Sequence, residues 1–434
     1  MSNFKKYPAY KDSGVEWLGE IPDHWNCRRL AAIGRFSKGG GFSKASLVEK
    51  GVPAILYGDI YTKYETKVSS EIRYVSDEIS TQSVMVQRGD ILFTGSGETK
   101  EDIGKCVVLD LDKPACAGGD VIVYKQRQNN SFFLSYFLNI EPVKFEKAKT
   151  SKGEIIVHTY ASKLRELSVS LPPPSEQAAI VNFLDDKTGK IDQAIAQKEE
   201  LIALLKERKQ IIIQNAVTKG LDPKVKMKDS GIEWLGEIPD HWEVSRSQNL
   251  FTQRKELARK GDQQLSATQA YGVILQKEYE KLVGRKVVKI SMHLEKRKHV
   301  ELNDFVISMR SFQGGLEVAW ATGCIRSSYV VLKPSGKIDS GFYRYLLKTR
   351  RYIEALQSTA NFIRDGQDLN FENFRQVSLP VIPLKEQQDI AIYLNQQMQK
   401  TDVAITQEQQ AIEKLKEYKA TLINSTVTGK IKVV

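Results

Sequence analysis

A fifteen-residue segment occurs twice in this chain, and each copy is followed by a second repeated segment. Residues 11–25 read KDSGVEWLGEIPDHW and residues 228–242 read KDSGIEWLGEIPDHW, so fourteen of the fifteen positions are identical. Residues 173–218 align with residues 383–428, while the sequences between these segments are almost unrelated. Because the period is far too long for a solenoid, each repeat is predicted to be a whole domain with an attached arm. The repeated segments, called the frame below, enclose two different sequences, called the inserts. This arrangement predicts a molecule that recognises two different targets with the same geometry.

The second repeated segment has the periodicity of a helix. Its apolar residues recur at steps of 7, 4, 7, 3, 7 and 4, which keeps them on one stripe. Prolines precede both copies, and Gly220 and Gly429 follow them, as expected at helix ends. Thr401 and Thr426 fall in the stripe of the second copy, which predicts looser packing there. The residues predicted to pair are Leu184, Ile191, Ile195, Ile202, Leu205 and Ile212 in the first copy and Leu394, Ile405, Ile412, Leu415 and Leu422 in the second.

These two arms are too long to be buried by a single small domain. A helix of about 43 residues extends about 65 Å. The favoured partner for each arm is the other arm, in an antiparallel coiled coil. The alternative is two separate surface helices, each packed on its own insert. The predicted boundaries are 1–172 for the first recognition domain, 173–220 for the first helix, 221–380 for the second domain and 381–434 for the second helix.

The two inserts are predicted to share a mixed α/β fold. The run Gly89–Phe93 in the first insert corresponds to Asn303–Ser308 in the second, and Val121–Tyr124 corresponds to Val330–Lys333. Short apolar runs of this kind, separated by turn-forming residues, are typical of strands. Helical stretches follow them around 131–149 and 341–358. The fold class is therefore α+β, with two mixed α/β domains in pseudo-two-fold tandem, joined by two long antiparallel helices.

The loops of the inserts contain residue types that suit DNA. Glycine lets a backbone amide approach a phosphate, Lys and Arg neutralise phosphate charge, and Arg, Gln and Asn can pair with base edges. A basic loop is more often a solvated surface than a contact, so each residue is only a candidate. The candidates in the first insert are Lys38, Phe42, Lys44, Ser96, Thr99, Lys100, Lys147, Lys149 and Lys152. Those in the second are Arg254, Lys255, Lys260, Arg310, Ser311, Gln313, Asn361, Arg364 and Gln367.

Composition supports a nucleic-acid partner without proving one. The formal net charge of the 434-residue chain is +11, which suits DNA, although many basic proteins bind none. The N-terminus has no apolar signal region, and no apolar run approaches the length needed to span a bilayer. The four cysteines lack the spacing of a zinc site or a disulfide framework, so we expect a reducing cytoplasm.

No motif for catalysis emerges from the sequence. There is no phosphate-binding G-x-x-x-x-G-K-[ST] loop and no Asn/Asp-Pro-Pro-aromatic signature of an amino-methyltransferase. His24 and His241 each precede a tryptophan in the repeated frame, where a structural contact is favoured over catalysis. No catalytic, cofactor-binding or metal-binding residue is therefore predicted on this chain.

The chain resembles the specificity subunit of type I restriction–modification systems over nearly its whole length. The resemblance is carried by the twin GxEWLGEIPDHW segments, by the Gly58-Asp59-Ile60 and Gly89-Asp90-Ile91-Leu92 phrases, and by the Pro-x-x-Glu-Gln openings at 173–177 and 383–387. It implies two target-recognition domains, each reading one half of a split site in double-stranded DNA. It also implies paired helices that hold two methyltransferase subunits, which restriction subunits then join. S-adenosylmethionine, ATP and magnesium are implied on those partner subunits, and no cofactor on this chain.

Two other functions remain open from the sequence alone. One is a DNA-binding enzyme with its own nuclease or methyltransferase site, against which the absent motifs weigh. The other is a coiled-coil scaffold whose inserts bind protein or carbohydrate, against which the net charge and basic loops weigh. Steep salt dependence of binding would separate a DNA-reading protein from such a scaffold.

Overall fold

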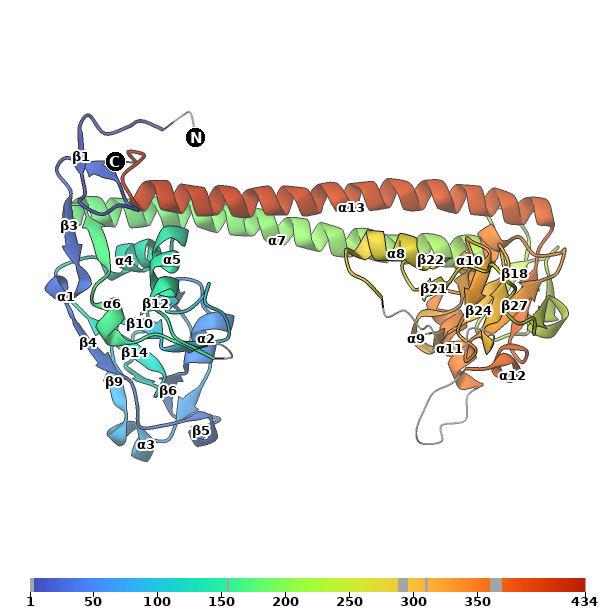
Figure 1. The fold of residues 1–434 in the computed structure, drawn as a ribbon, viewed down its shortest axis with the longest axis horizontal. Helices are drawn as coiled ribbons and strands as arrows, with labels where there is room; N and C mark the ends of the chain where they lie inside the picture. The colour runs from blue at the N-terminus through green and yellow to red at the C-terminus, as the bar shows by residue number, and fades with distance from the viewer. Residues whose placement is uncertain (1–3, 154–155, 288–295, 309–310, 360–368, 434) are drawn as a thin grey trace. The chain divides into compact units, whose positions relative to one another are not determined.

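The computed structural model describes residues 4–153, 156–287, 296–308, 311–359 and 369–433. The chain divides into two compact units: unit 1 comprises Met1–Lys198 with Gln410–Val434, and unit 2 comprises Glu199–Gln409. Each unit contains one insert and part of both long helices, which are labelled in Figure 1. Both inserts combine helices with sheets whose strand pairs are mostly antiparallel, so the predicted α+β class is confirmed.

Both predicted long helices are present. Helix α7 spans Pro174–Lys219, with 46 residues, and α13 spans Leu384–Val427, with 44 residues. Helix α13 begins after the predicted boundary at 381 because Val381 ends strand β28 (Ser378–Val381), which pairs with β19 (Glu243–Arg246). Gly220 and Gly429 follow the helices with φ of 74° in both cases, as a left-handed helix end requires.

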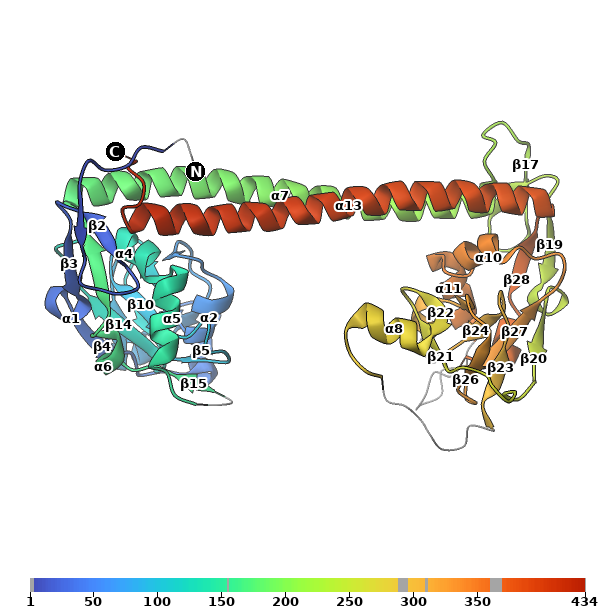
Figure 2. The same cartoon turned by 45° about the horizontal axis from the view of Figure 1, so that its top comes forward.

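The two helices are antiparallel within each unit. In unit 1, Lys419 Nζ on α13 lies 2.7 Å from Asp192 Oδ1 on α7, and Val427 accepts from Ser170 Oγ just before α7 begins. In unit 2, Lys209 Nζ on α7 lies 2.6 Å from Asp402 Oδ1 on α13. The two helices lie side by side in both views (Figures 1 and 2). The alternative of two separate surface helices is therefore excluded.

Most of the predicted stripe lies in cores that contain residues of both helices: Leu184, Ile191, Ile195, Leu415 and Leu422 in unit 1, and Ile212 and Leu394 in unit 2. Its residues are buried or half-buried, and Leu184, Leu394 and Leu422 are fully buried. The looser packing predicted at the threonines is wrong at Thr426, which is also fully buried. Its Oγ1 donates to Leu422 O at 2.7 Å, so the hydroxyl is satisfied inside its own helix and its methyl group can pack.

The insert of unit 1 contains two five-stranded sheets. The first sheet has the order β4-β14-β10-β12-β7 and the second the order β5-β8-β6-β13-β9. The first consists of β4 (Arg35–Lys38), β14 (Val121–Lys125), β10 (Ile91–Thr94), β12 (Cys106–Leu109) and β7 (Lys67–Val68). The second consists of β5 (Leu47–Val48), β8 (Tyr74–Val75), β6 (Val52–Ile55), β13 (Ala115–Ala117) and β9 (Val84–Val86). The predicted strands are present, and the Gly58-Asp59-Ile60 phrase lies in a short helix, α2 (Tyr57–Thr62).

The insert of unit 2 repeats the first of these sheets. Its four strands have the order β20-β27-β24-β25. They are β20 (Phe251–Arg254), β27 (Val330–Pro334), β24 (Phe305–Ile307) and β25 (Glu317–Val318). The turn before the central strand is shared: Gly89 has a φ of 88°, and Asn303 has a φ of 71°. Ser131 Oγ donates to Gly89 O, and Ser340 Oγ donates to Asn303 O. The predicted correspondence between the two inserts is confirmed at this turn.

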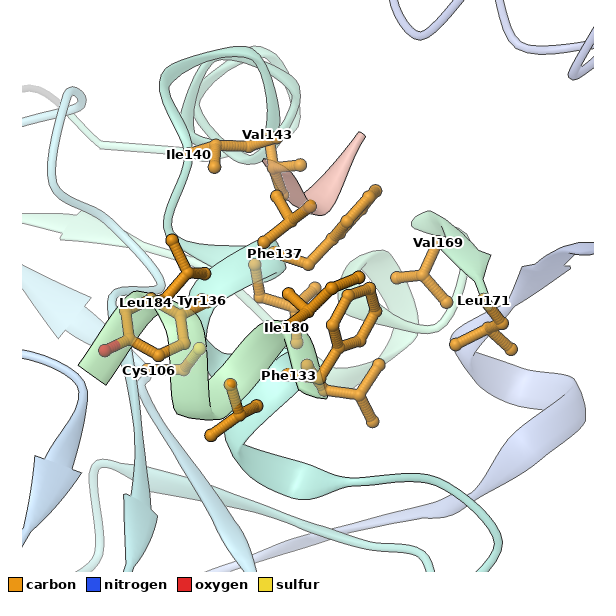
Figure 3. Close-up of a cluster of buried hydrophobic side chains, with 14 of the residues drawn as sticks. Cys106, Phe133, Tyr136, Phe137, Ile140, Val143, Val169, Leu171, Ile180 and Leu184 are labelled. Carbon is orange, nitrogen blue, oxygen red and sulfur yellow. The ribbon is translucent and has the colours of Figure 1, made fainter. Parts of the chain in front are cut away.

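Each predicted helical stretch after the sheet is broken into two. In unit 1 they are α4 (Ser131–Leu138) and α5 (Glu141–Lys149), with Pro142 in the first turn of α5. In unit 2 they are α10 (Ser340–Leu346) and α11 (Arg350–Ser358), where Thr349 caps the second helix. Figure 3 shows how α4 joins the core of unit 1: Phe133 and Phe137 lie among Ile180 and Leu184 of α7.

The two repeated sequence segments meet at one joint in each unit. The Nε1 atoms of Trp25 and Trp242 donate to Glu176 Oε1 and Glu386 Oε1 at 3.2 and 3.1 Å, in the first turns of α7 and α13. His24 Nε2 and His241 Nε2 lie 2.9 and 2.8 Å from the other oxygens of the same carboxylates. Both tryptophans are fully buried. These joints give the repeated residues a structural role, as favoured for the histidines.

The glutamine after each of these glutamates ties the helix to the insert. Gln177 Oε1 accepts from Asn130 N at 2.7 Å, next to the start of α4. Gln387 Oε1 accepts from Asp339 N at 2.7 Å, next to the start of α10. The pair Glu-Gln in each Pro-x-x-Glu-Gln opening therefore fixes an insert and its frame segment to the same helix turn.

Candidate nucleic-acid interface

Three predicted residues of the first insert surround one recess. Lys38, Phe42 and Lys44 line a hollow of about 560 Å³. Lys38 ends β4, and Lys44 lies in a short turn of helix before β5; both side chains are exposed. Phe42 is almost buried and packs in the small core under the second sheet. Phe42 therefore forms a wall of the recess, while the two lysines are placed to meet an anion.

The second predicted loop offers two exposed residues and one buried residue. Thr99 and Lys100 are exposed. Ser96 is 5% exposed, and its Oγ lies 3.0 Å from His158 Nδ1 across the pairing of β11 (Ser96–Gly97) with β15 (Val157–His158). Ser96 therefore stabilises this loop through an internal contact, and Thr99 and Lys100 remain candidates for DNA contact.

The structure removes Lys147 from the basic cluster in the first insert. Its side chain is 1% exposed, and Nζ donates to Gly104 O and Leu138 O at 2.7 and 2.9 Å. Burial lowers the pKa of this amine to about 8. The prediction failed because Lys147 lies on the inward face of α5. Lys149 and Lys152 are exposed and remain candidates, with Lys149 Nζ 2.7 Å from Glu146 Oε1.

Arg254 is likewise removed from the candidates in the second insert. It is 6% exposed, and its guanidinium donates to carboxylates of Glu256, Glu301 and Asp304. With its Nε, Nη1 and Nη2 atoms all engaged, it holds the end of β20 to the turn before β24. Lys255 and Lys260 are exposed, and Lys260 lines a smaller hollow of about 300 Å³.

The glycine-flanked loop of the second insert is only partly described. Ser311 is buried, and its Oγ accepts from Ser308 N at 2.9 Å, so it fixes the loop. Gln313 is exposed in the short helix α9 (Ser311–Gly314). The predicted contacts Arg310, Asn361, Arg364 and Gln367 lie outside the described residues.

Sequence reasoning missed Arg73 and Asp120, which also line the recess of the first insert. Arg73 lies in a polar stretch without glycine, and its partner Asp59 is 14 residues away. Only the fold brings β8, α2 and the turn after β13 together, so no local pattern marked these residues.

The described part of the chain contains no group of three or more His, Cys, Asp or Glu side chains that could hold a metal ion. His299 is buried, and its Nδ1 lies 2.8 Å from Asp262 Oδ2. Within the same residues, no helix has both the length and the apolar character needed to cross a membrane.

Comparison with known proteins identifies the two repeats as copies of one domain type. Residues 22–203 and 239–414 each match the family described as the type I restriction modification DNA specificity domain. A putative type I restriction enzyme specificity subunit, MjaX, from Methanocaldococcus jannaschii is 26% identical over 96% of both chains. The specificity subunit of EcoKI from Escherichia coli is 22% identical over 48% of this chain and 45% of its own length.

Solved structures share the fold at low sequence identity. One comes from work on complex assembly and conformational transition of the type I R-M system. It has a TM-score of 0.68 at 14% identity and covers 94% of this chain and 98% of its own. The HsdS subunit from Thermoanaerobacter tengcongensis has a TM-score of 0.54 at 15% identity, covering 97% of this chain and all of its own.

Proposed function

This chain belongs to the family of type I restriction–modification DNA specificity subunits, and we propose that it selects the DNA site for a multisubunit enzyme. Each insert, as a target-recognition domain, reads one half of a bipartite site in double-stranded DNA. Because the two inserts carry different loops, the two half-sites differ and the whole site is asymmetric. The chain is a specificity subunit and not a catalytic one.

One observation carries this proposal: two different sets of loops are held by the same joint. The Trp25–Glu176 and Trp242–Glu386 contacts fix each insert to the start of a long helix in the same way. The two inserts have different loops but are attached to the helices by the same contacts. Such a protein is suited to binding two different DNA sequences in equivalent orientations. The proposal extends to the helices, whose length sets the gap between half-sites.

The proposal also assigns the chemistry to partner subunits. Two methyltransferase subunits dock on the paired helices and bind S-adenosylmethionine, and restriction subunits use ATP and magnesium. The assembly works in the cytoplasm, where chromosomal DNA is methylated. No step of methyl transfer or cleavage is assigned to a residue of this chain.

Mapping N6-methyladenine in the host genome, with and without this chain, tests the proposal. We expect one bipartite, asymmetric motif to lose its methylation when the chain is deleted and to regain it when the chain is supplied again. An unchanged set of methylated motifs would contradict the proposal. Methyl transfer or cleavage by the pure chain alone would favour an enzyme with its own active site.

A further inference from the structure

Arg73 is held by a carboxylate on one side only. Its Nε lies 2.7 Å from Asp59 Oδ1 and 2.9 Å from Asp59 Oδ2. Asp59 is itself fixed, since its Oδ2 accepts from Leu56 N, and its side chain is 3% exposed. Within the described residues, neither Nη atom of Arg73 has a hydrogen-bond partner. The ion pair therefore orients the guanidinium and leaves the Nη1/Nη2 fork available for a ligand.

Two other arginines of the chain have carboxylate partners on more of their guanidinium nitrogens. The guanidinium of Arg254 is buried and engages three carboxylates through Nε, Nη1 and Nη2. Arg88 is exposed on the same insert as Arg73, but its nitrogens lie near Asp110 and Asp112, at 2.9 to 3.7 Å. Arg73 differs from both because its side chain is 34% exposed, is anchored by one rigid partner and lines a recess.

The recess has room for a ligand to approach closely. Gly58 and Gly119 line it, and a Cβ atom added to either would meet nothing within 4 Å. No packing requirement in the described structure therefore demands glycine at these two positions. Small residues at an open surface allow a base edge or a sugar–phosphate chain to come near the backbone.

The charges around the recess match a base pair better than a phosphate. Asp120 is exposed and lines the recess together with Arg73, and its backbone oxygen accepts from Gly95 N. A carboxylate in the lining of the recess would repel a phosphate, but it can accept from the exocyclic amine of cytosine. An arginine fork pairs with the N7 and O6 acceptors of guanine. Lys38 and Lys44 are exposed and also line the recess, so their amines are available to neutralise flanking phosphates.

We propose that Arg73 reads a guanine in the half-site recognised by the first insert, with Asp120 contacting the cytosine of the same base pair. Asp59 is the positioning residue that keeps the arginine fork aimed into the recess. This inference rests on the proposed function and adds to it a specific base pair and the residues that select it.

The test is a binding selection on duplexes with both half-sites randomised, using the full-length chain with its methyltransferase subunits. The key variant is Arg73→Lys, which keeps a cation beside Asp59 but removes the planar fork. Asp120→Ala is the second variant, and Arg88→Lys, an exposed arginine of the same insert, is the matched control. A melting curve for each variant shows whether the insert remains folded.

We expect Arg73→Lys to melt close to the wild type and to lose about 10- to 100-fold of its preference for guanine at one position. Asp120→Ala should relax the same base pair, and Arg88→Lys should leave every position unchanged. An unaltered preference in folded Arg73→Lys would overturn the inference. A uniform loss of affinity for all sequences would also overturn it, since that result indicates a phosphate contact. If the wild-type complex selects no sequence at all, the proposed function itself fails.

Discussion

Trp25 donates its indole hydrogen to Glu176 across 151 residues of sequence, with 3.2 Å between Nε1 and Oε1. Trp242 and Glu386 form the same contact in unit 2 at 3.1 Å. The GxEWLGEIPDHW segment ends with the donor, and the Pro-x-x-Glu-Gln opening supplies the acceptor. The strongest repeated motifs of the sequence are therefore the two halves of one structural joint.

Removing the acceptor of this joint should destabilise the protein. Glu386→Ala leaves the buried Trp242 N–H without a partner, which costs about 1–3 kcal/mol. The control is Glu413→Ala, because Glu413 is exposed on the same helix and contacts Lys416 within that helix. The free energies of unfolding, measured in urea, check the prediction. Equal effects of the two substitutions would show that the joint adds nothing to stability.

The interhelical ion pair of Lys419 should contribute more to stability than an ion pair within one helix. Burial opposes charge on Lys419, but hydrogen bonds with Asp192 and Glu65 raise the pKa of its amine. Because both carboxylates are about half exposed or more, solvent screening limits the loss in Lys419→Ala to about 1 kcal/mol. Lys416→Ala, which breaks only a contact within one helix, should cost less than about 0.5 kcal/mol. Thermal unfolding of both variants at low and high salt checks the difference, and equal losses would argue against an interhelical role for Lys419.

Burial of Lys147 should make stability depend on pH in alkaline solution. Its pKa is lowered by burial to about 8 in the folded protein, from an ordinary value of 10.5. The unfolded chain therefore binds more protons between these two values, and stability rises as pH increases through this window. The full effect is on the order of 3 kcal/mol, since each unit of pKa is worth about 1.4 kcal/mol.

The check is to compare wild type with Lys147→Met between pH 7.5 and 10, which is roughly the titration window above. The wild type should gain stability relative to the variant as pH rises. A pH-independent difference between the two proteins would show that the pKa of Lys147 is ordinary.

The helix pair makes a specific prediction about the gap between half-sites. Adding seven residues to α7 alone would offset Asp192 from Lys419 or Lys209 from Asp402, and it should destabilise the pair. Adding seven residues to both helices, after Lys198 and after Gln409, keeps the register of each ion pair. At about 1.5 Å per helical residue and 3.4 Å per base pair, the gap should grow by about three base pairs. Methylation mapping with the lengthened chain checks this, and an unchanged gap would rule out the helices as the spacer.

The frame could be predicted from the sequence because its signals are local and repeated. The stripe from Leu184 to Ile212 follows helical spacing, so the helix and its paired face could be predicted from neighbouring residues alone. The functional surface could not be predicted in the same way. Lys147 and Lys149 are the same residue type and only two positions apart, yet Lys147 is buried and Lys149 is exposed, because only the fold decides which face of α5 points inward. Arg73 was missed because its role depends on Asp59, Asp120 and two glycines from separate elements.

If the two inserts recognise DNA independently on a repeated frame, exchanging one insert must change one half-site alone. Strand β3 (Asn26–Arg29) pairs with β16 (Ser168–Leu171), so residues 26–171 form a segment with both of its closing strands. We would replace this segment with the corresponding insert of another family member and map methylation in cells that supply the partner subunits. We expect a new sequence in one half-site, with the other half-site and the gap unchanged. A change in both half-sites would contradict independent recognition.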